Sequence, residues 1–424
     1  MKKELKQIVD ETQTTYGLED YYLGRYHLYR DKNSHQETSY YLSMEWFPNK
    51  YKDRDKEEEN PEGTAAIEVH LHTKAVHSII FVGGVTYATK RDAFPIRDLT
   101  HVIEWIENET GLTWGKQFQL VHEKNGEFLF KGVIDNIPVY PSAVISVQFN
   151  NTDQFTGYSI NGVFPKDEEV NWEPFNLLPD MVETFIERQC QRVQFPNIDQ
   201  KKWRTFYAIE ELFVTNDGKH TIPFEIFQSD GQYVELNHLI EWDEPIQSEN
   251  EFVGEPIFVY EEIDLEQALQ HEPHPDLAPI TEDDITACIN ATTLFLRQQY
   301  PAVSRKWNLK QIRRDQGFLV ALLKPATDTH IFSHKINIFI DSETKNVVNY
   351  IDSSMLFTDF QDYEDANEIN ISHADALDKL RKYIKVTPVY VYDKSKNSYL
   401  LCGKIDCHYG VDATTGEMFA FNEL

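Results

Sequence analysis

Two stretches that lie far apart in this chain align with each other without a gap. LVHEKNGEFLFKGVID begins at Leu120 and VYDKSKNSYLLCGKID begins at Val391, and their aromatic, aliphatic, glycine and aspartate positions coincide. Each follows a helical pattern of apolar residues and precedes two period-2 apolar runs that a polar turn joins. The chain is therefore predicted to repeat one structural unit, a helix followed by antiparallel strands.

Five such units are predicted, starting near residues 1, 98, 177, 281 and 372. In the last unit Ser372 is the expected helix N-cap, and in the second unit Gly111 is the expected stop signal. Each unit should close with a hairpin. The expected hairpins are IEVHLHTKAVHSI near residue 70, ISVQFNNTDQFTGY near 150, FEIFQSDGQYVEL near 230, INIFIDSETKNVVNY near 342 and YGVDATTGEMFAF near 412.

Composition and unit spacing together predict an α+β fold, with tandem units of one helix packed on an antiparallel β-sheet and arranged in two lobes. Hydrophobic residues make up 41% of the 424 residues and aromatic residues 13%, which favours a folded, strand-rich protein. Two units are expected in residues 1–165 and a third, irregular one in 166–242. An acidic, proline-containing linker or lid is expected in 243–280, where the lobes divide, and two further units in 281–424.

The net charge of -30 narrows the range of partners. Such a polyanion is repelled by phosphate backbones and by anionic lipid headgroups, so nucleic acids and membrane surfaces are not expected partners. No Lys or Arg occurs from His220 to Leu296, a span with eighteen Asp or Glu residues. This span is interpreted either as a solubilising surface or as a docking surface for a basic partner or cations.

The N-terminal sequence MKKELKQIVDETQTTYG has no apolar core of the kind that signal peptides carry. No window of the sequence approaches the roughly 20 apolar residues that a membrane span needs. A cytoplasmic location is therefore expected from the sequence.

Two histidine pairs are candidates for metal binding. Glu68, His70 and His72 alternate along one face of a predicted strand, and His271 and His274 lie in the proline-rich stretch HEPHPD. The repeat alignment places His72 at the hairpin position of Asn150, Asp341 and Asp412, which favours a structural role. The prolines exclude a regular helical pair in the second case. No metal ion and no cofactor are therefore expected.

Cys402 and Cys407 bracket the stretch GKID. If that stretch were a turn, the two thiols could approach disulfide distance across a hairpin, but ordinary half-buried thiols are the leading interpretation. Cys190 and Cys288 fall in helical patterns, where thiols act as small core residues.

The sequence lacks the common catalytic motifs. It contains no G-x-S-x-G, H-E-x-x-H, G-x-x-x-x-G-K-[ST] or G-x-G-x-x-G pattern, so no catalytic residue is assigned. Aromatic-rich stretches such as SYYLSMEWF are interpreted as sheet packing, with an exposed binding face as the alternative.

The segments SHADALDKLRKYI, PVYVYD, YLLCGKID and VDATTGEM resemble the YcdB/YcdC-type repeat proteins of Gram-positive bacteria and, through them, the PepSY domain. The resemblance covers residues 281–424 well and 1–165 through the internal alignment. It implies a helix on an antiparallel sheet that serves as a binding or inhibitory module associated with peptidases, without catalytic residues. Members of the family are usually exported.

Three functions follow as hypotheses. The first is a non-catalytic binding or regulatory protein that restrains a protein or peptide partner such as a peptidase, with sheet edges that accept a peptide strand. The second is a metal-dependent hydrolase that uses His70 and His72 with a distant carboxylate. The third is a self-associating structural protein. The sequence gives no oligomeric state.

Overall fold

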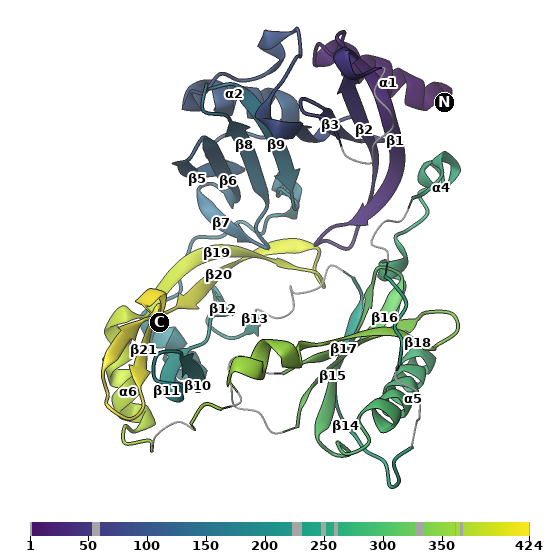
Figure 1. The fold of residues 1–424 in the computed structure, drawn as a ribbon. Helices are drawn as coiled ribbons and strands as arrows, with labels where there is room; N and C mark the ends of the chain where they lie inside the picture. Colours follow the sequence, from purple (N-terminus) through teal and green to yellow (C-terminus); the bar gives the residue numbers. More distant parts are fainter. Residues whose placement is uncertain are drawn as a thin grey trace. The chain divides into compact units, whose positions relative to one another are not determined.

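Antiparallel strands with one apolar face make up most of the protein, so the chain has the predicted α+β fold (Figure 1). The computed structural model describes residues 2–52, 60–222, 231–246, 252–257, 262–326, 334–360, 362–364 and 368–423. None of the described helices is long and apolar enough to cross a lipid bilayer.

The chain divides into two compact units along lines that differ from the predicted domains. Unit 1 consists of Met1–Glu173, Tyr260–His274 and Val389–Leu401, and unit 2 consists of Pro174–Val259, Pro275–Pro388 and Cys402–Leu424. The predicted linker 243–280 therefore contributes to both units. Its residues Ile263, Leu265 and Ala268 are buried in the core of unit 1, which a surface linker would not be.

Unit 1 contains two helix-plus-strand blocks and a short helix from the acidic span. Its elements are α1 (Lys3–Thr15), β1 (Tyr21–Lys32), β2 (Thr38–Pro48), β3 (Ala65–His70), β4 (Val76–Phe81), α2 (Leu99–Thr110), β5 (Phe118–Lys124), β6 (Glu127–Ile134), β7 (Ile137–Tyr140), β8 (Val144–Phe149), β9 (Phe155–Asn161) and α4 (Leu265–Leu269). As predicted, Gly111 ends α2, in the left-handed conformation with φ 72°.

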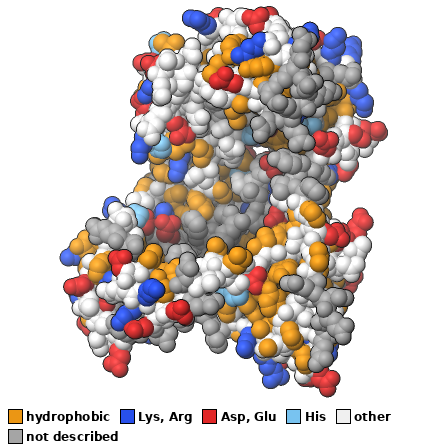
Figure 2. All heavy atoms as spheres, in the orientation of Figure 1, with side chains coloured by type: hydrophobic (Ala, Val, Ile, Leu, Met, Phe, Trp, Pro, Cys, Tyr) orange, Lys and Arg blue, Asp and Glu red, His pale blue; other side chains and the backbone are white. Residues whose placement is uncertain are grey.

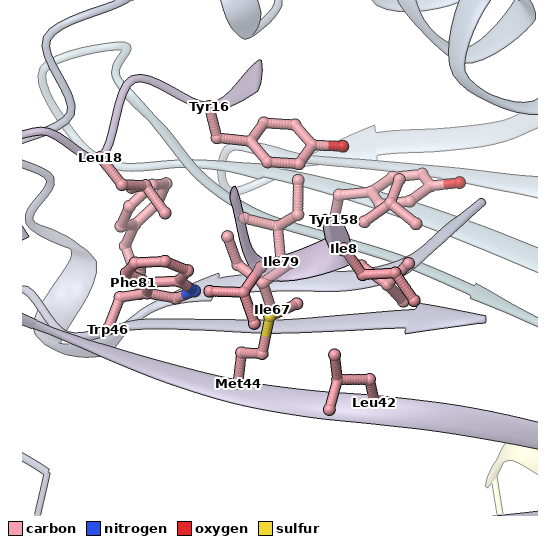
Figure 3. Packing of buried hydrophobic residues seen from close by; sticks show 14 of the residues in the cluster. Ile8, Tyr16, Leu18, Leu42, Met44, Trp46, Ile67, Ile79, Phe81 and Tyr158 are labelled. Atoms are coloured by element: carbon pink, nitrogen blue, oxygen red, sulfur yellow. The ribbon is translucent and has the colours of Figure 1, made fainter. Parts of the chain in front are cut away.

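The two blocks of unit 1 share one sheet and one core. The strand order is β1-β2-β3-β4-β9-β8-β6-β7, and the antiparallel pairing of β4 with β9 joins the blocks. On β2, Leu42, Met44 and Trp46 alternate inward and are almost fully buried. Figure 3 shows them with Ile8 of α1 and with Tyr158 of β9 in one packed layer. The apolar stripe of α1 therefore reaches the same core as the second block.

Unit 2 holds the remaining helices and sheets. Its elements are α3 (Pro179–Gln189), β10 (Cys190–Asn197), β11 (Lys202–Ile209), β12 (Leu212–Thr215), β13 (Thr221–Ile222), β14 (Tyr233–Ile240), α5 (Glu282–Gln299), β15 (Trp307–Asp315), β16 (Phe318–Pro325), β17 (Ile336–Asp341), β18 (Val347–Asp352), α6 (His373–Leu380), β21 (Tyr409–Asp412) and β22 (Met418–Ala420). The strands β19 (Lys385–Asp393) and β20 (Ser398–Asp406) run from residues assigned to one unit into residues assigned to the other. Ser372 caps α6 through a bond from the Asp375 N–H, as predicted.

Unit 2 has two separate cores. In the first, α3 and α6 pack with the sheet β10-β11-β21-β22, in which β11 pairs with β21. In the second, α5 packs on the sheet β14-β15-β16-β17-β18. The predicted hairpin near residue 230 falls partly outside the described residues. Its described arm, β14, pairs with β15, which follows α5, and thus belongs to the sheet of the next helix.

The hydroxyl of Tyr158 generates a stability prediction for unit 1. It is buried and has no hydrogen-bond partner within the described part of the chain. We expect Tyr158→Phe either to raise the free energy of unfolding or to lower it by less than about 1 kcal/mol. The reason is that a buried hydroxyl without a hydrogen-bond partner does not stabilise the fold. The control is Tyr16→Phe, because Tyr16 donates to Glu109 Oε2 at 3.1 Å and should lose about 1–2 kcal/mol. Urea unfolding compares them, and a greater loss for Tyr158→Phe contradicts the prediction.

The first turn of α5 generates a pH prediction for unit 2. Asp284 accepts bonds from the Thr281 N–H at 3.1 Å and from Arg314 Nη2 at 3.0 Å, and it also pairs with Lys345. Burial opposes its ionised form, but the Lys345 ammonium and the Thr281 cap outweigh burial and hold the pKa of Asp284 at about 2.

Because this pKa lies below the ordinary value of 3.8, the stabilisation is complete above pH 3.8 and is lost as the pH falls toward 2. Asp284→Asn should therefore cost about 2 kcal/mol at pH 7, and the difference from the native protein should shrink below pH 4. Glu282→Gln, in the same exposed turn, is the control and should cost only a few tenths of a kcal/mol. Urea unfolding at pH 7, 4 and 3 measures both, and a pH-independent difference contradicts the assignment.

Candidate functional site

The first candidate metal ligands are held by structural contacts. Glu68 Oε2 accepts a hydrogen bond from Ser78 Oγ at 2.7 Å, across the β3–β4 pair. His70 Nδ1 accepts from the Thr73 N–H at 3.2 Å, in the turn that follows β3. Burial, with smaller contributions from His72 and His77, lowers the pKa of His70, so a neutral ring with its proton on Nε2 fits this contact.

The turn position that the repeat alignment gave to His72 belongs to His70. In the hairpins at His70, Asp341 and Asp412, this residue donates its N–H to the carbonyl of the fifth residue along the chain. Its carbonyl accepts from the fourth residue, and that residue has a positive φ. The alignment misplaced the position by two residues, which in a strand preserves the face and so leaves the apolar pattern unchanged. His70 therefore supplies the acceptor that a carboxylate supplies elsewhere.

His72 and His271, which the sequence placed in separate candidate sites, meet in unit 1. Their rings stack with centroids 4.4 Å apart, and burial and the neighbouring His271 lower the pKa of His72. His274 is buried, and its N–H donates to Thr38 Oγ1 at 2.8 Å. Among the described residues, no group of three His, Cys, Asp or Glu side chains is placed to hold a metal ion.

Asp276, which is close to these histidines in sequence, stabilises a turn in unit 2. It belongs to unit 2, is fully buried, and accepts bonds from the Gln316 and Gly317 N–H groups, both at 2.8 Å. Its carboxylate thus stabilises the turn between β15 and β16.

Aromatic rings line the face of the unit 1 sheet that is turned away from the core. Tyr29 and Tyr41 stack at 5.2 Å, and Tyr41 also contacts His70 at 5.5 Å and His77 at 4.6 Å between ring centroids. Burial, with the Glu68 carboxylate nearby, raises the pKa of Tyr29 above its ordinary value. These half-buried rings agree with the predicted sheet packing of the aromatic-rich stretches.

The cysteines do not form the disulfide that the sequence left open. Residues 403–406 belong to β20 and not to a turn, so Cys402 and Cys407 are separated by about 16 Å of extended chain. Cys190 begins β10, which corrects its predicted helical position, while Cys288 lies in α5 as predicted. All four cysteines are reduced and buried.

Within unit 1, residues 262–274 lie against the free side of β1, the first strand of the sheet. We call these residues the edge segment. Glu262 forms an antiparallel bridge with Tyr29, and the Ile263 N–H donates to the Leu28 carbonyl at 3.0 Å. The segment then turns into α4, whose Leu265 and Ala268 enter the core. Two residues of a remote part of the chain, Glu262 and Ile263, thus pair with an edge strand through the backbone.

Arg30 holds the other end of the edge segment. Its side chain is only 4% exposed, and Nη1 donates to the Glu272 carbonyl at 3.2 Å, to Glu272 Oε1 at 3.0 Å and to the Pro273 carbonyl at 2.9 Å. The Tyr40 hydroxyl donates to the same Glu272 carbonyl at 2.6 Å. A buried guanidinium needs such partners, because an uncompensated buried charge costs several kcal/mol. The sequence carried one signal for this site: Arg30 is in phase with inward-facing Leu28.

A second part of the acidic span covers an edge in unit 2. The Glu255 N–H donates to the Val348 carbonyl of β18 at 2.8 Å, and Asn349 Nδ2 donates to the Glu255 carbonyl at 2.8 Å. A Cβ atom at Gly254 would lie 2.4 Å from Asn349 Oδ1, so a larger residue there would require the Asn349 side chain to move. Phe252 anchors the segment, with its ring centroid 5.2 Å from that of Phe295.

Exposed apolar side chains occur near the same strand. Figure 2 shows hydrophobic side chains gathered on the part of unit 2 that carries β14 to β18. Ile351, at the end of β18, is 57% exposed, and the following Met355 and Leu356 are 85% and 74% exposed. Exposed groups of this kind mark interaction surfaces more often than isolated apolar residues do.

Comparisons with known proteins give little further guidance. No protein-family model matches the sequence, and no curated protein matches it. Among solved structures, the chain is similar to the Bacillus megaterium YpeB C-terminal domain, with 6% identity over 83% of this chain and 97% of that chain. The TM-score is 0.25, too low to support an argument about fold or function.

The buried thiols generate a reactivity prediction. Burial raises the pKa of Cys288 to about 12, and burial and the neighbouring Cys407 thiol raise that of Cys190 to about 11. Since the thiolate is the reactive form, we expect no rapid labelling of the native chain by a thiol reagent and labelling of all four cysteines after unfolding. Peptide mapping under oxidising conditions is the second readout. A native fast phase, or a Cys402–Cys407 crosslink, would falsify this prediction.

Proposed function

We propose that this chain is a non-catalytic binding or regulatory protein, built from PepSY-like units, that restrains a protein partner such as a peptidase by pairing with it at a sheet edge. Support for the units comes from local geometry. The helices α1, α2, α3, α5 and α6 are each followed by antiparallel strands, and equivalent turns close the hairpins at Asp341 and Asp412.

The observation that carries the proposal is the pairing of the edge segment with β1. Backbone contacts at Glu262 and Ile263, followed by the side-chain contacts of Arg30, are the two components by which sheet edges bind extended peptides. The backbone contacts supply affinity, and the side-chain contacts supply selectivity. The strands β10, β22 and β14 end their sheets in the described strand order and offer further edges of the same kind.

The metal-dependent hydrolase is less well supported, because its proposed ligands already form hydrogen bonds with other groups. Glu68 is bound to Ser78, and the Nδ1 atom of His70 is bound to the turn. Zinc binding at His70 through Nδ1 would break a hairpin contact.

The test begins with affinity capture by the tagged full chain from a lysate of the source organism. Each captured protein is purified and recombined with the chain, and amide hydrogen exchange is measured. We expect protection of backbone amides in a sheet-edge strand, and we expect a captured peptidase to be inhibited at equimolar chain. Deletion of the acidic span is not a clean control, because it removes the buried residues Ile263, Leu265 and Ala268.

The matched control is His70→Asn, since Asn150 supplies the acceptor in the hairpin between β8 and β9. This variant should fold and bind the partner like the native chain. The proposal fails if no recombined protein protects an edge strand. It also fails if the native chain shows zinc-dependent peptide hydrolysis that His70→Asn abolishes.

A further inference from the structure

The contacts of Arg30 define a slot whose chemistry is specific. Arg30 and Tyr40 present donors to two consecutive carbonyls and one carboxylate, all from Glu272 and Pro273. Thr38 Oγ1 accepts the next backbone N–H, that of His274. A strand edge, buried donors and a hydroxyl acceptor in this order recognise a peptide backbone that carries an acidic residue.

Apolar anchors lie between the two polar ends of the slot. Ile263, Leu265 and Ala268 of the edge segment are at most 7% exposed, while Leu269, which follows them, is 53% exposed. The bound pattern is therefore a residue that pairs with β1 through its backbone, then aliphatic residues that enter the core from α4, then an acidic residue beside Arg30. Glu272 contacts the buried Arg30 guanidinium while 45% of its own side chain stays exposed, so this one acidic residue makes a specific contact as well as contributing to the charged surface.

We propose that this slot on β1 and β2 is a docking site for a peptide of a partner protein that carries aliphatic residues followed by an acidic residue, and that the edge segment, with its short helix α4, is its intramolecular occupant. The proposal rests on the proposed function and specifies its site and partner chemistry. The partner must displace the edge segment, so the free protein is held in an autoinhibited state. Release of the segment leaves Arg30 without its Glu272 and Pro273 acceptors, and the incoming peptide replaces them.

The test uses a fluorescent peptide with the sequence of residues 260–274 and the full-length chain. The native chain should bind this peptide weakly, because its tethered copy competes. A chain with Leu265→Ser and Glu272→Ala, both within the edge segment, should bind it at least tenfold more tightly by fluorescence polarisation. Adding Arg30→Gln should remove that gain, and Arg30→Lys should restore part of it. A peptide with Leu265→Ser, equal in length and charge, is the matched control and should bind more weakly.

Folding is checked independently. Each variant must unfold cooperatively in urea, and hydrogen exchange at the Ile263 amide, which donates to the Leu28 carbonyl, must rise in the double variant, which reports release of the edge segment. The inference is wrong if exchange rises there without tighter peptide binding, or if Arg30→Gln leaves the gain intact. If a recombined partner still protects β10, β14 or β22, the proposed function stands and only this assignment of the site fails.

Discussion

The pairing of sheet edges is the constraint on which this structure depends. A block of one helix and a few strands leaves two edges with unpaired N–H and C=O groups and encloses only a small core. In unit 1 the pairing of β4 with β9 removes two edges and merges the cores beneath α1 and α2. In unit 2 the pairing of β11 with β21 does the same for α3 and α6. Four blocks that are marginal alone are thereby joined in pairs, while the block of α5 and β14 to β18 keeps a sheet and a core of its own.

Where no strand is available, the acidic span covers the unpaired N–H and C=O groups of a sheet edge. It covers β18 at Glu255 and β1 at Glu262, and at each place an apolar residue, Phe252 or Ile263, enters a core. Covering an edge also prevents aggregation, and that role needs only a charged, poorly pairing segment. Burying Arg30 beneath a carboxylate is not needed for it. Burying a cation costs free energy, and protection of the edge alone would not require it. We therefore infer that the β1 edge selects the segment that binds to it.

Local features of this fold could be predicted from sequence, and non-local ones could not. The cap at Ser372, the stop at Gly111 and the hairpin of β17 and β18 follow from patterns within a few residues. The pairing of β14 with β15 could not be predicted, because a half-buried strand has the same pattern beside either neighbour. The contact between Arg30 and Glu272 could not be predicted for the same reason, because the two residues lie far apart in sequence. The histidines that the sequence singled out take part in a turn and in a ring stack.

The covalent attachment of the edge segment to the chain determines how strongly a partner must bind at β1. A segment joined to the chain at both ends acts at an effective concentration of order millimolar, so a partner at micromolar concentration needs about a thousandfold greater affinity for the slot alone. The net charge of -30 adds long-range repulsion against an acidic partner. The affinity of one peptide contact is too small to overcome both the competing edge segment and the charge repulsion. A partner that also engages a second surface of the chain would gain the missing affinity by avidity, and binding would then require two features of one protein.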